Sequence, residues 1–279
     1  MRTVKAYKLA KPDGYDFYTG KTINYRENIG KIVKCPNADS KLGICSRGVI
    51  HASKNPNDCF IGAGIPCSAY FVEGKPECGD VEKWGFTEFK VQEEILDLDK
   101  LFEWNYTEAC NPLNPLRQKR KPTKADIKLL RDWSSARASV RASVGDSVWA
   151  SVRASVWASV WDSVRVSVWA SVRTSVRDSV GDSVGASVRA SVRASVRDSV
   201  RDSVWVSVGD SVWAYIGSLF PNIKKWRYNK HRVVEYPYQS CTDLWKRSLV
   251  PSFDGRIWQL HSGKNADIVF EISKEELLK

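Results

Sequence analysis

The sequence of 279 residues lacks an uninterrupted apolar run of about twenty residues, and we therefore expect no membrane-spanning helix. Its basic N-terminus is not followed by an apolar stretch, so we expect no secretory signal peptide. The seven cysteines form no Cys-x2-Cys or Cys-x4-Cys pair, which are spacings typical of zinc sites. We therefore predict reduced thiols in a cytoplasmic protein that binds no metal and no cofactor.

The sequence also lacks the common catalytic motifs. It contains no Ser/His/Asp order, no paired-carboxylate motif and no complete glycine-rich phosphate loop. His51 is the best single candidate for catalysis, although a lone histidine among Val49, Ile50 and Ala52 also fits a core position. The sequence leaves open whether the protein is an enzyme, and the lack of catalytic motifs favours a protein that is not one.

Positive charge is concentrated in one segment. The chain carries a net charge of +11, and residues 117–137 hold eight basic residues against two acidic ones. Such a run is typical of a surface for polyanions, and it is equally typical of a solvated linker. We assign residues 117–137 as a basic linker or N-terminal cap of the segment that follows.

A tandem tetrapeptide dominates residues 138–217. Nineteen consecutive Ser-Val pairs run from Ser139 to Ser211, and Tyr215-Ile216 then replaces the pair in the same phase. The residue after each valine is Arg, Trp or Gly, whereas the residue before each serine varies more freely. A fixed period of this kind determines the fold of its segment.

We compared a helix with a β-solenoid for this repeat. In an α-helix a period of four advances by about 40° per unit, so the valines would wind around the helix. Serine, valine and glycine are also mediocre or poor helix formers. Stacked short strands place valine inward and use glycine at corners. We therefore predict a mainly β fold in which residues 138–217 form a parallel β-solenoid, or parallel β-helix, between two small flanking regions.

The spacing of the arginines suggests the size of one coil. Taking every third unit from the first gives six arginines in a row and then Trp213, which predicts about twelve residues per coil, with sixteen as the alternative. This column consists of Arg141, Arg153, Arg165, Arg177, Arg189 and Arg201. The array resembles the pentapeptide-repeat family, whose units also alternate an inward aliphatic residue with small and variable outward ones. The resemblance implies a rigid rod with a valine core and carries no catalytic residue.

Residues 1–116 are predicted to form an α+β or mainly β domain, because short apolar runs alternate with Gly/Pro/Asn turn signals. The segment 48–60, Gly-Val-Ile-His-Ala-Ser-Lys-Asn-Pro-Asn-Asp-Cys-Phe, resembles a Gly-Phe-His-Ala-Cys-x-Asn-Pro-x-Asp pattern of uncharacterised bacterial and phage domains. That resemblance implies a bacterial or phage origin and no particular reaction.

Residues 218–279 are predicted to form a C-terminal cap. Lys224, Lys225, Trp226 and Arg227 begin a run of basic and aromatic residues, a pattern suited to phosphate contact and base stacking, or to covering the end of the array. Two strand-like segments around residues 262–265 predict a hairpin. Ser273 followed by Glu276 is a capping-box pattern, which predicts a short terminal helix.

The leading functional prediction is a non-enzymatic repeat scaffold that presents Arg and Trp ladders to a partner. The tryptophans expected to be exposed on the ladder are Trp149, Trp157, Trp161, Trp169, Trp205 and Trp213. The expected partner is an unidentified protein, a second copy of the chain, or a nucleic acid or other polyanion bound weakly and without sequence specificity. Two alternatives remain: an enzyme with its chemistry in residues 1–116 and the array as spacer, and a structural self-assembling protein.

Overall fold

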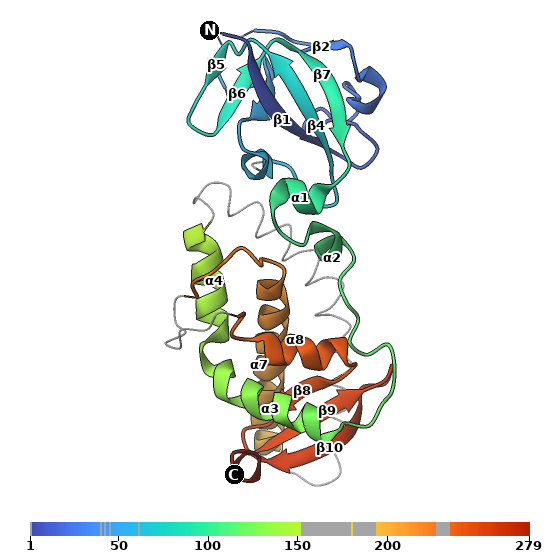
Figure 1. Cartoon of the computed structure of the whole chain (residues 1–279), viewed down its shortest axis with the longest axis vertical. Helices are drawn as coiled ribbons and strands as arrows, with labels where there is room; N and C mark the ends of the chain where they lie inside the picture. The colour runs from blue at the N-terminus through green and yellow to red at the C-terminus, as the bar shows by residue number, and fades with distance from the viewer. Residues whose placement is uncertain are drawn as a thin grey trace. The chain divides into compact units, whose positions relative to one another are not determined.

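The computed structural model describes residues 2–39, 41, 43–44, 46–60, 62–151, 180, 194–226 and 235–279. These residues form two compact units, which divide after Thr107. The element labels follow Figure 1.

A seven-stranded antiparallel sheet is the framework of the first unit, with the order β2-β7-β4-β1-β3-β6-β5. Its strands are β1 (Val4–Ala10), β2 (Ile32–Lys34), β3 (Ile50–Ser53), β4 (Ser68–Gly74), β5 (Cys78–Gly79), β6 (Lys83–Phe86) and β7 (Glu88–Ile95). The short elements are η1 (Arg26–Asn28), η3 (Pro56–Phe60) and α1 (Leu98–Phe102), and the boundary after Thr107 falls within α2 (Tyr106–Cys110). At the centre of the sheet, β4 pairs with β1 along its whole length.

The core of this unit explains where its polar site lies. Side chains alternate between the two faces of a strand, so Ala6, Lys8 and Ala10 of β1 share one face. Ala6 and Ala10 are fully buried in a core that also contains Tyr25 and Tyr70. Lys8 therefore enters an otherwise apolar face, and its side chain is only 12% exposed.

The second unit combines helices with a three-stranded antiparallel sheet of order β10-β9-β8 (Figure 1). Its elements are α3 (Lys124–Ala136), η4 (Arg137–Ser139), α4 (Val140–Ser151), α7 (Ala194–Ser218), α8 (Gln239–Lys246), β8 (Val250–Phe253), β9 (Ile257–Ser262), β10 (Asp267–Ser273) and α9 (Lys274–Leu277). Helix α7 packs against β8, α8 and α4, and α3 packs against α8.

Two local predictions for the C-terminal region are confirmed. Strands β9 and β10 form an antiparallel hairpin, with Asp267 opposite Ser262. The terminal helix α9 begins with a capping box, in which Ser273 Oγ accepts from the backbone N–H of Glu276 and the Glu276 side chain accepts from the N–H of Ser273. Both predictions relied on short-range chemistry that neighbouring elements do not alter.

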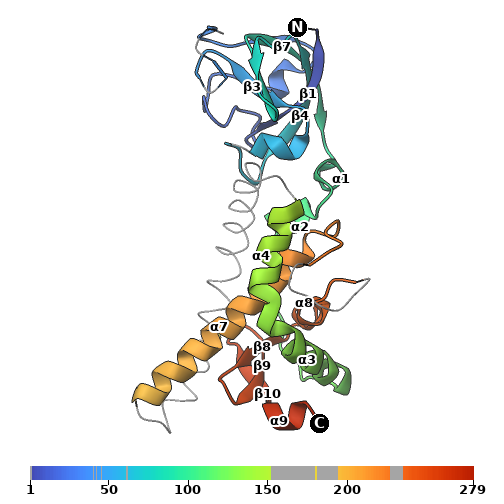
Figure 2. The same ribbon diagram turned by 90° about the vertical axis from the view of Figure 1, so that its left-hand side faces the viewer.

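The prediction of a parallel β-solenoid is wrong. The described repeat residues are helical in α4 and α7, and the sheets of the described residues are antiparallel and lie outside the repeat. The coil of twelve or sixteen residues is overturned with it, and so is the Arg and Trp ladder that a coil would have stacked. The described parts of the chain therefore have an α+β fold, in which the repeat residues of α4 and α7 are helical. Figure 2 shows α4 and α7 crossing obliquely.

Packing on several sides explains why a helix is formed in spite of the winding valines. Val204, Val208 and Val212 are buried, and from the first to the third the valine position advances by only about 80° around α7. Helix α7 has partners on more than one side, so a winding stripe stays covered. A four-residue period also produces continuous ridges along the i±4 rows, which is the commonest basis of helix–helix packing.

Two buried repeat serines of α7, Ser207 and Ser211, bond within their own helix. Ser207 Oγ donates to Val204 O at 2.8 Å, and Ser211 Oγ donates to Ser207 O at 3.1 Å. Such back-bonds satisfy a hydroxyl that would otherwise be costly to bury. Gly145 of α4 would meet no atom within 4 Å if it carried a Cβ, so its cost is limited to helix propensity.

Candidate functional site

The first unit contains a cavity of about 250 Å³ beside β1 and β3. Lys8, Asp16, Tyr18 and His51 line it, and the same four residues line a second cavity of about 280 Å³. The two cavities therefore adjoin around one polar cluster. The remaining polar lining of the first cavity includes Ser46, Ser53, Asp58, Cys59 and Lys83.

A buried ion pair stands at the centre of this cluster. Lys8 Nζ lies 2.7 Å from Asp16 Oδ2, and the phenol of Tyr25 donates to the same oxygen at 2.8 Å. Lys8 Nζ also lies 5.4 Å from the centre of the Tyr25 ring, within range of a cation–π contact. Asp16 and Tyr25 are the partners that the described residues give to the Lys8 ammonium, which carries three N–H donors.

Asp16 is a positioning group and not a proton acceptor. Its Oδ1 accepts from the backbone N–H of Tyr18 at 2.9 Å and of Thr19 at 3.0 Å, so both carboxylate oxygens are engaged. Burial raises the pKa of Asp16, but the Lys8 charge and the hydrogen bonds outweigh burial and hold the pKa well below its ordinary value. The carboxylate stays ionised and fixes both Lys8 and the loop that carries Tyr18.

His51 is a neutral group that points one nitrogen to the backbone. Its Nε2 is hydrogen-bonded to the carbonyl of Ile44, and since a carbonyl only accepts, Nε2 carries the proton. Burial lowers the pKa of His51 below 6.5, and the charges of Lys8 and Lys83 lower it further. The neutral imidazole therefore keeps a lone pair on Nδ1, which makes it a hydrogen-bond acceptor.

Cys59 lines the first cavity but is not an activated nucleophile. Its thiol donates to the carbonyl of Tyr7 at 3.1 Å, and burial raises the pKa of Cys59 to about 11. The thiolate is the reactive form of cysteine, so a protonated thiol at neutral pH is chemically quiet.

The rim of the site is aromatic and basic. Tyr18 is 82% exposed although it lines both cavities, so its ring is available to a ligand that enters either one. Lys83 lines the first cavity and Arg47 the second. The combined lining thus contains three cations, Lys8, Lys83 and Arg47, and two carboxylates, those of Asp16 and Asp58. Its net charge is one positive unit.

His51, the catalytic candidate of the sequence analysis, lines both cavities, whereas Lys8, Asp16 and Tyr18, which line them too, were not among the sequence candidates. One sequence signal for Lys8 existed: in the run Ala6-Tyr7-Lys8-Leu9-Ala10 a lysine occupies the same strand phase as two alanines. Asp16 carries no comparable signal, because its burial depends on the loop that brings it beside β1.

The structure places only some of the predicted ladder residues. Arg141, the first arginine of the predicted column, lies in α4, and Arg201, the last one, lies in α7. Trp149 lies in α4, and Trp205 and Trp213 lie in α7. The rest lie outside the described residues: Arg153, Arg165, Arg177, Arg189, Trp157, Trp161 and Trp169.

The residues predicted to bind a partner after the repeat, Lys224 to Arg227, do not share one environment. Lys224 and Lys225 are exposed, and Lys224 Nζ donates to Pro221 O at 3.0 Å. Trp226 is buried and makes edge contacts with Tyr236 and Tyr238. Arg227 lies outside the described residues. The exposed lysines and the buried ring therefore have different surroundings.

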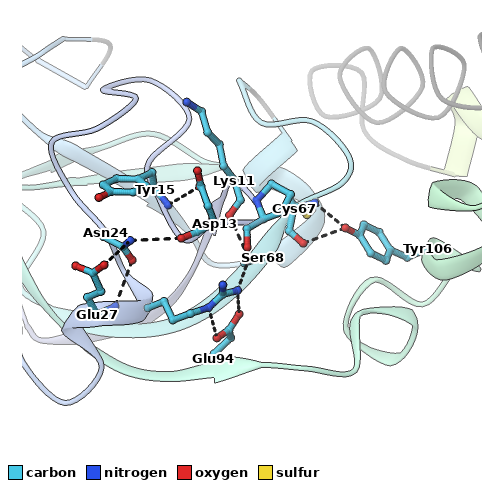
Figure 3. A network of polar contacts seen from close by, with 11 residues as sticks. Lys11, Asp13, Tyr15, Asn24, Glu27, Cys67, Ser68, Glu94 and Tyr106 are labelled. Atoms are coloured by element: carbon cyan, nitrogen blue, oxygen red, sulfur yellow. Dashed lines mark hydrogen bonds and ion pairs between the residues drawn. The ribbon is translucent and has the colours of Figure 1, made fainter.

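A second polar network in the first unit is structural (Figure 3). Arg26 forms two bonds to Glu94, at 3.0 and 2.6 Å, and a third to Ser68 Oγ at 3.1 Å. Ser68 Oγ in turn lies 3.1 Å from Lys11 O, and Tyr106 OH bonds to the backbone of Cys67. These contacts join loop 11–28 to β4 and β7.

The second unit contains a Ser–His pair that is closed to substrates. Ser252 Oγ lies 2.8 Å from His261 Nε2, and His261 Nδ1 lies 2.9 Å from Ala266 O. Both residues are fully buried, and burial lowers the pKa of His261 to about 4. The serine hydroxyl has no exposed surface, and the Ser252–His261 contact joins β8 to β9.

The structure gives no metal centre within the described residues, where no group of three or more His, Cys, Asp or Glu side chains is suited to hold an ion. The six described cysteines are free thiols, and Cys45 lies outside the described part of the chain. Among the helices that are described, none is both long and apolar enough to cross a membrane.

Comparison with known proteins identifies no relative of this chain. No protein-family model, no curated protein and no solved structure matches it. The resemblances to pentapeptide repeats and to uncharacterised phage domains are not tested by these comparisons.

Proposed function

We propose that the first unit is a non-catalytic binding module for a small organic anion, and that the chain acts as an interaction protein and not as an enzyme. The observation that carries this proposal is the pair of adjoining cavities built around a buried, fixed lysine. A desolvated lysine held in place by a carboxylate offers N–H donors to an anion at low conformational cost.

The lining specifies the chemistry of the ligand. Lys8 and Lys83 favour a carboxylate or phosphate group, and the Nδ1 lone pair of His51 favours a hydroxyl or amine donor on the same molecule. The exposed ring of Tyr18 adds an apolar contact for the body of the ligand. A phosphorylated or carboxylated polyol combines these features.

The state of the candidate catalytic groups favours binding over catalysis. The carboxylate of Asp16 is engaged at both oxygens, and the thiol of Cys59 is protonated, so neither supplies a base or nucleophile at neutral pH. Of Asp16, Cys59 and His51, only His51 would be left for proton transfer. A positioned single base without a nucleophile is weak support for the enzyme alternative.

Calorimetric titration of the full chain tests the proposal. We expect a hexose phosphate to bind more tightly than inorganic phosphate, and the neutral hexose not to bind. Lys83→Gln should weaken the hexose phosphate at least fivefold. Lys90→Gln is the matched control, because Lys90 is exposed on β7 and lines neither cavity. The proposal fails if neither phosphate compound binds, or if both variants weaken binding equally.

We further propose a cytoplasmic location. Support comes from thiols that serve as hydrogen-bond donors in the packed interior: Cys35 donates to Arg47 O at 3.3 Å, and Cys59 donates to Tyr7 O. A reducing compartment preserves such thiols. Alkylation of fresh extract followed by mass spectrometry should find them unpaired, and a disulfide that includes either residue would contradict the location.

A further inference from the structure

The second unit carries a basic surface that is separate from the cavities. It is formed by Arg117, Lys119, Arg120, Lys121, Lys246, Arg247 and Lys264. These cations come from three segments: the stretch before α3, the end of α8 and the turn between β9 and β10. Figure 1 shows the stretch before α3 passing beside the three-stranded sheet.

One serine joins the three segments. Ser262 Oγ accepts from the backbone N–H of Arg120 at 3.0 Å and lies 3.1 Å from Gln118 O and 2.8 Å from Ser248 O. The N–H of Gly263 also donates to Gln118 O at 3.2 Å. The backbone that carries the basic surface is therefore fixed and not a free linker.

Two of the arginines share one buried carboxylate. Arg120 Nη2 lies 2.6 Å from Asp126 Oδ2, and Arg247 Nη1 lies 3.3 Å from Asp126 Oδ1. Asp126 has no exposed surface, while the side chains of Arg120 and Arg247 are 32% and 47% exposed. The carboxylate thus orients two guanidinium groups that still reach solvent.

The local charges do not cancel. The basic surface contains seven cations, and the acidic residues around it are Asp126, Asp243 and Asp267, of which Asp267 pairs with Lys119 at 2.6 Å. The excess is therefore four positive charges. The dipole of α8 favours Lys246 and Arg247 at its C-terminus, but it does not account for exposed Lys121 and Lys264.

We infer that this basic surface binds the phosphate backbone of a nucleic acid. Planar guanidinium groups in fixed positions match the bidentate geometry of phosphate, and the surrounding lysines add long-range attraction. Segments that bind membrane surfaces combine basic residues with exposed apolar ones. The exposed large apolar side chains described in this unit are Val206, Ile257 and Leu278, and none belongs to the segments of the basic surface. Contacts to phosphate carry no sequence information, so binding is independent of base sequence.

Fluorescence anisotropy with a labelled 20-base-pair DNA tests this inference on the full chain. The test variant is Lys121→Gln/Lys246→Gln/Lys264→Gln. The control variant is Lys41→Gln/Lys75→Gln/Lys90→Gln, which removes the same charge from exposed positions of the first unit. Wild type and control should bind with a steep salt dependence. In the test variant the slope of log affinity against log salt should fall by up to about 3, and affinity at the lowest salt should fall at least tenfold.

Several results would overturn the inference. Wild type that does not bind DNA at the lowest salt would do so, as would equal losses in the test and control variants. Binding of wild type to phosphatidylserine vesicles without binding to DNA would assign the basic surface to a lipid headgroup instead. Since the three lysines are exposed, the test variant should fold; if circular dichroism shows otherwise, Lys264→Gln alone should lower the slope by about 1.

Discussion

Removing the buried carboxylate of Asp16 is the sharpest test of the site described in the first unit. Asp16→Asn keeps the shape of the side chain but leaves Lys8 without its counter-ion in an apolar face. It also places an NH2 group near donors, because Asp16 accepts from Tyr18 N, Thr19 N and Tyr25 OH. Breaking one side of a buried ion pair costs about 3–5 kcal/mol, and we expect Asp16→Asn to destabilise the first unit by about that amount.

The loss should depend on pH in a defined direction. The folded-state pKa of Asp16 lies well below its ordinary value of 3.8. The stabilisation is therefore complete above the pKa of the unfolded chain and is lost as the pH falls toward the folded-state pKa. The difference between wild type and Asp16→Asn should be constant from pH 5 to pH 8 and should shrink below about pH 4.

Hydrogen exchange of the β1 amides, followed as a function of urea, measures the stability of this unit in the full chain. The control is the pair of variants Lys8→Met and Asp16→Asn/Lys8→Met. Because the double variant removes the uncompensated charge, it should cost less than the sum of the two single variants. Additive losses, or a loss below about 1 kcal/mol for Asp16→Asn, would refute the assignment of a buried pair.

Three further predictions follow from packing, burial and backbone geometry. Val208→Ala should cost about 2 kcal/mol in urea denaturation, whereas Val206→Ala, at a position 49% exposed in the same helix, should cost little. Because burial lowers the pKa of His261 to about 4, the second unit should lose up to about 3 kcal/mol as the pH falls from 6.5 to 4, and His261→Asn should flatten that dependence. Gly14→Ala should cost clearly more than Gly30→Ala, measured by hydrogen exchange, since both have positive φ but only at Gly14 would a Cβ lie 2.6 Å from Asn24 Oδ1.

The parts of the fold that the sequence predicts well are those set by neighbouring residues. The β9–β10 hairpin and the capping box of α9 depend on a few adjacent side chains, and both are confirmed. The repeat is different, because a period of four is compatible with helical ridges as well as with short strands. The propensities of Ser, Val and Gly favour strands over helix. Residues of the repeat nevertheless form helix α7, which packs against β8 and α8, two elements outside the repeat.

The candidate site shows the same division. His51 was visible in the sequence because histidine is rare in this chain, and Lys8 left a trace as a charged residue in an apolar strand phase. No sequence pattern predicts the contacts of Lys8 and Tyr25 with Asp16. These contacts arise when the loop after β1 folds back over the sheet, and loop paths are not encoded in periodicity.

Two described helices that share one tetrapeptide pattern, α4 and α7, must also specify one register among several. Ser and Val ridges match equally well after a shift of four residues, so the ridges alone do not choose. The choice comes from residues that break the pattern: Arg137 Nε lies 2.7 Å from Asp210 Oδ2, and Tyr215 OH accepts from the N–H of Leu113 at 2.9 Å. A shift by one unit would place Val206 where Asp210 stands and leave a largely buried guanidinium without its partner. Asp210, at a variable position, and Tyr215, which replaces a repeat serine, therefore fix α7 against η4 and the stretch around Leu113, whereas the Ser and Val ridges only permit that packing.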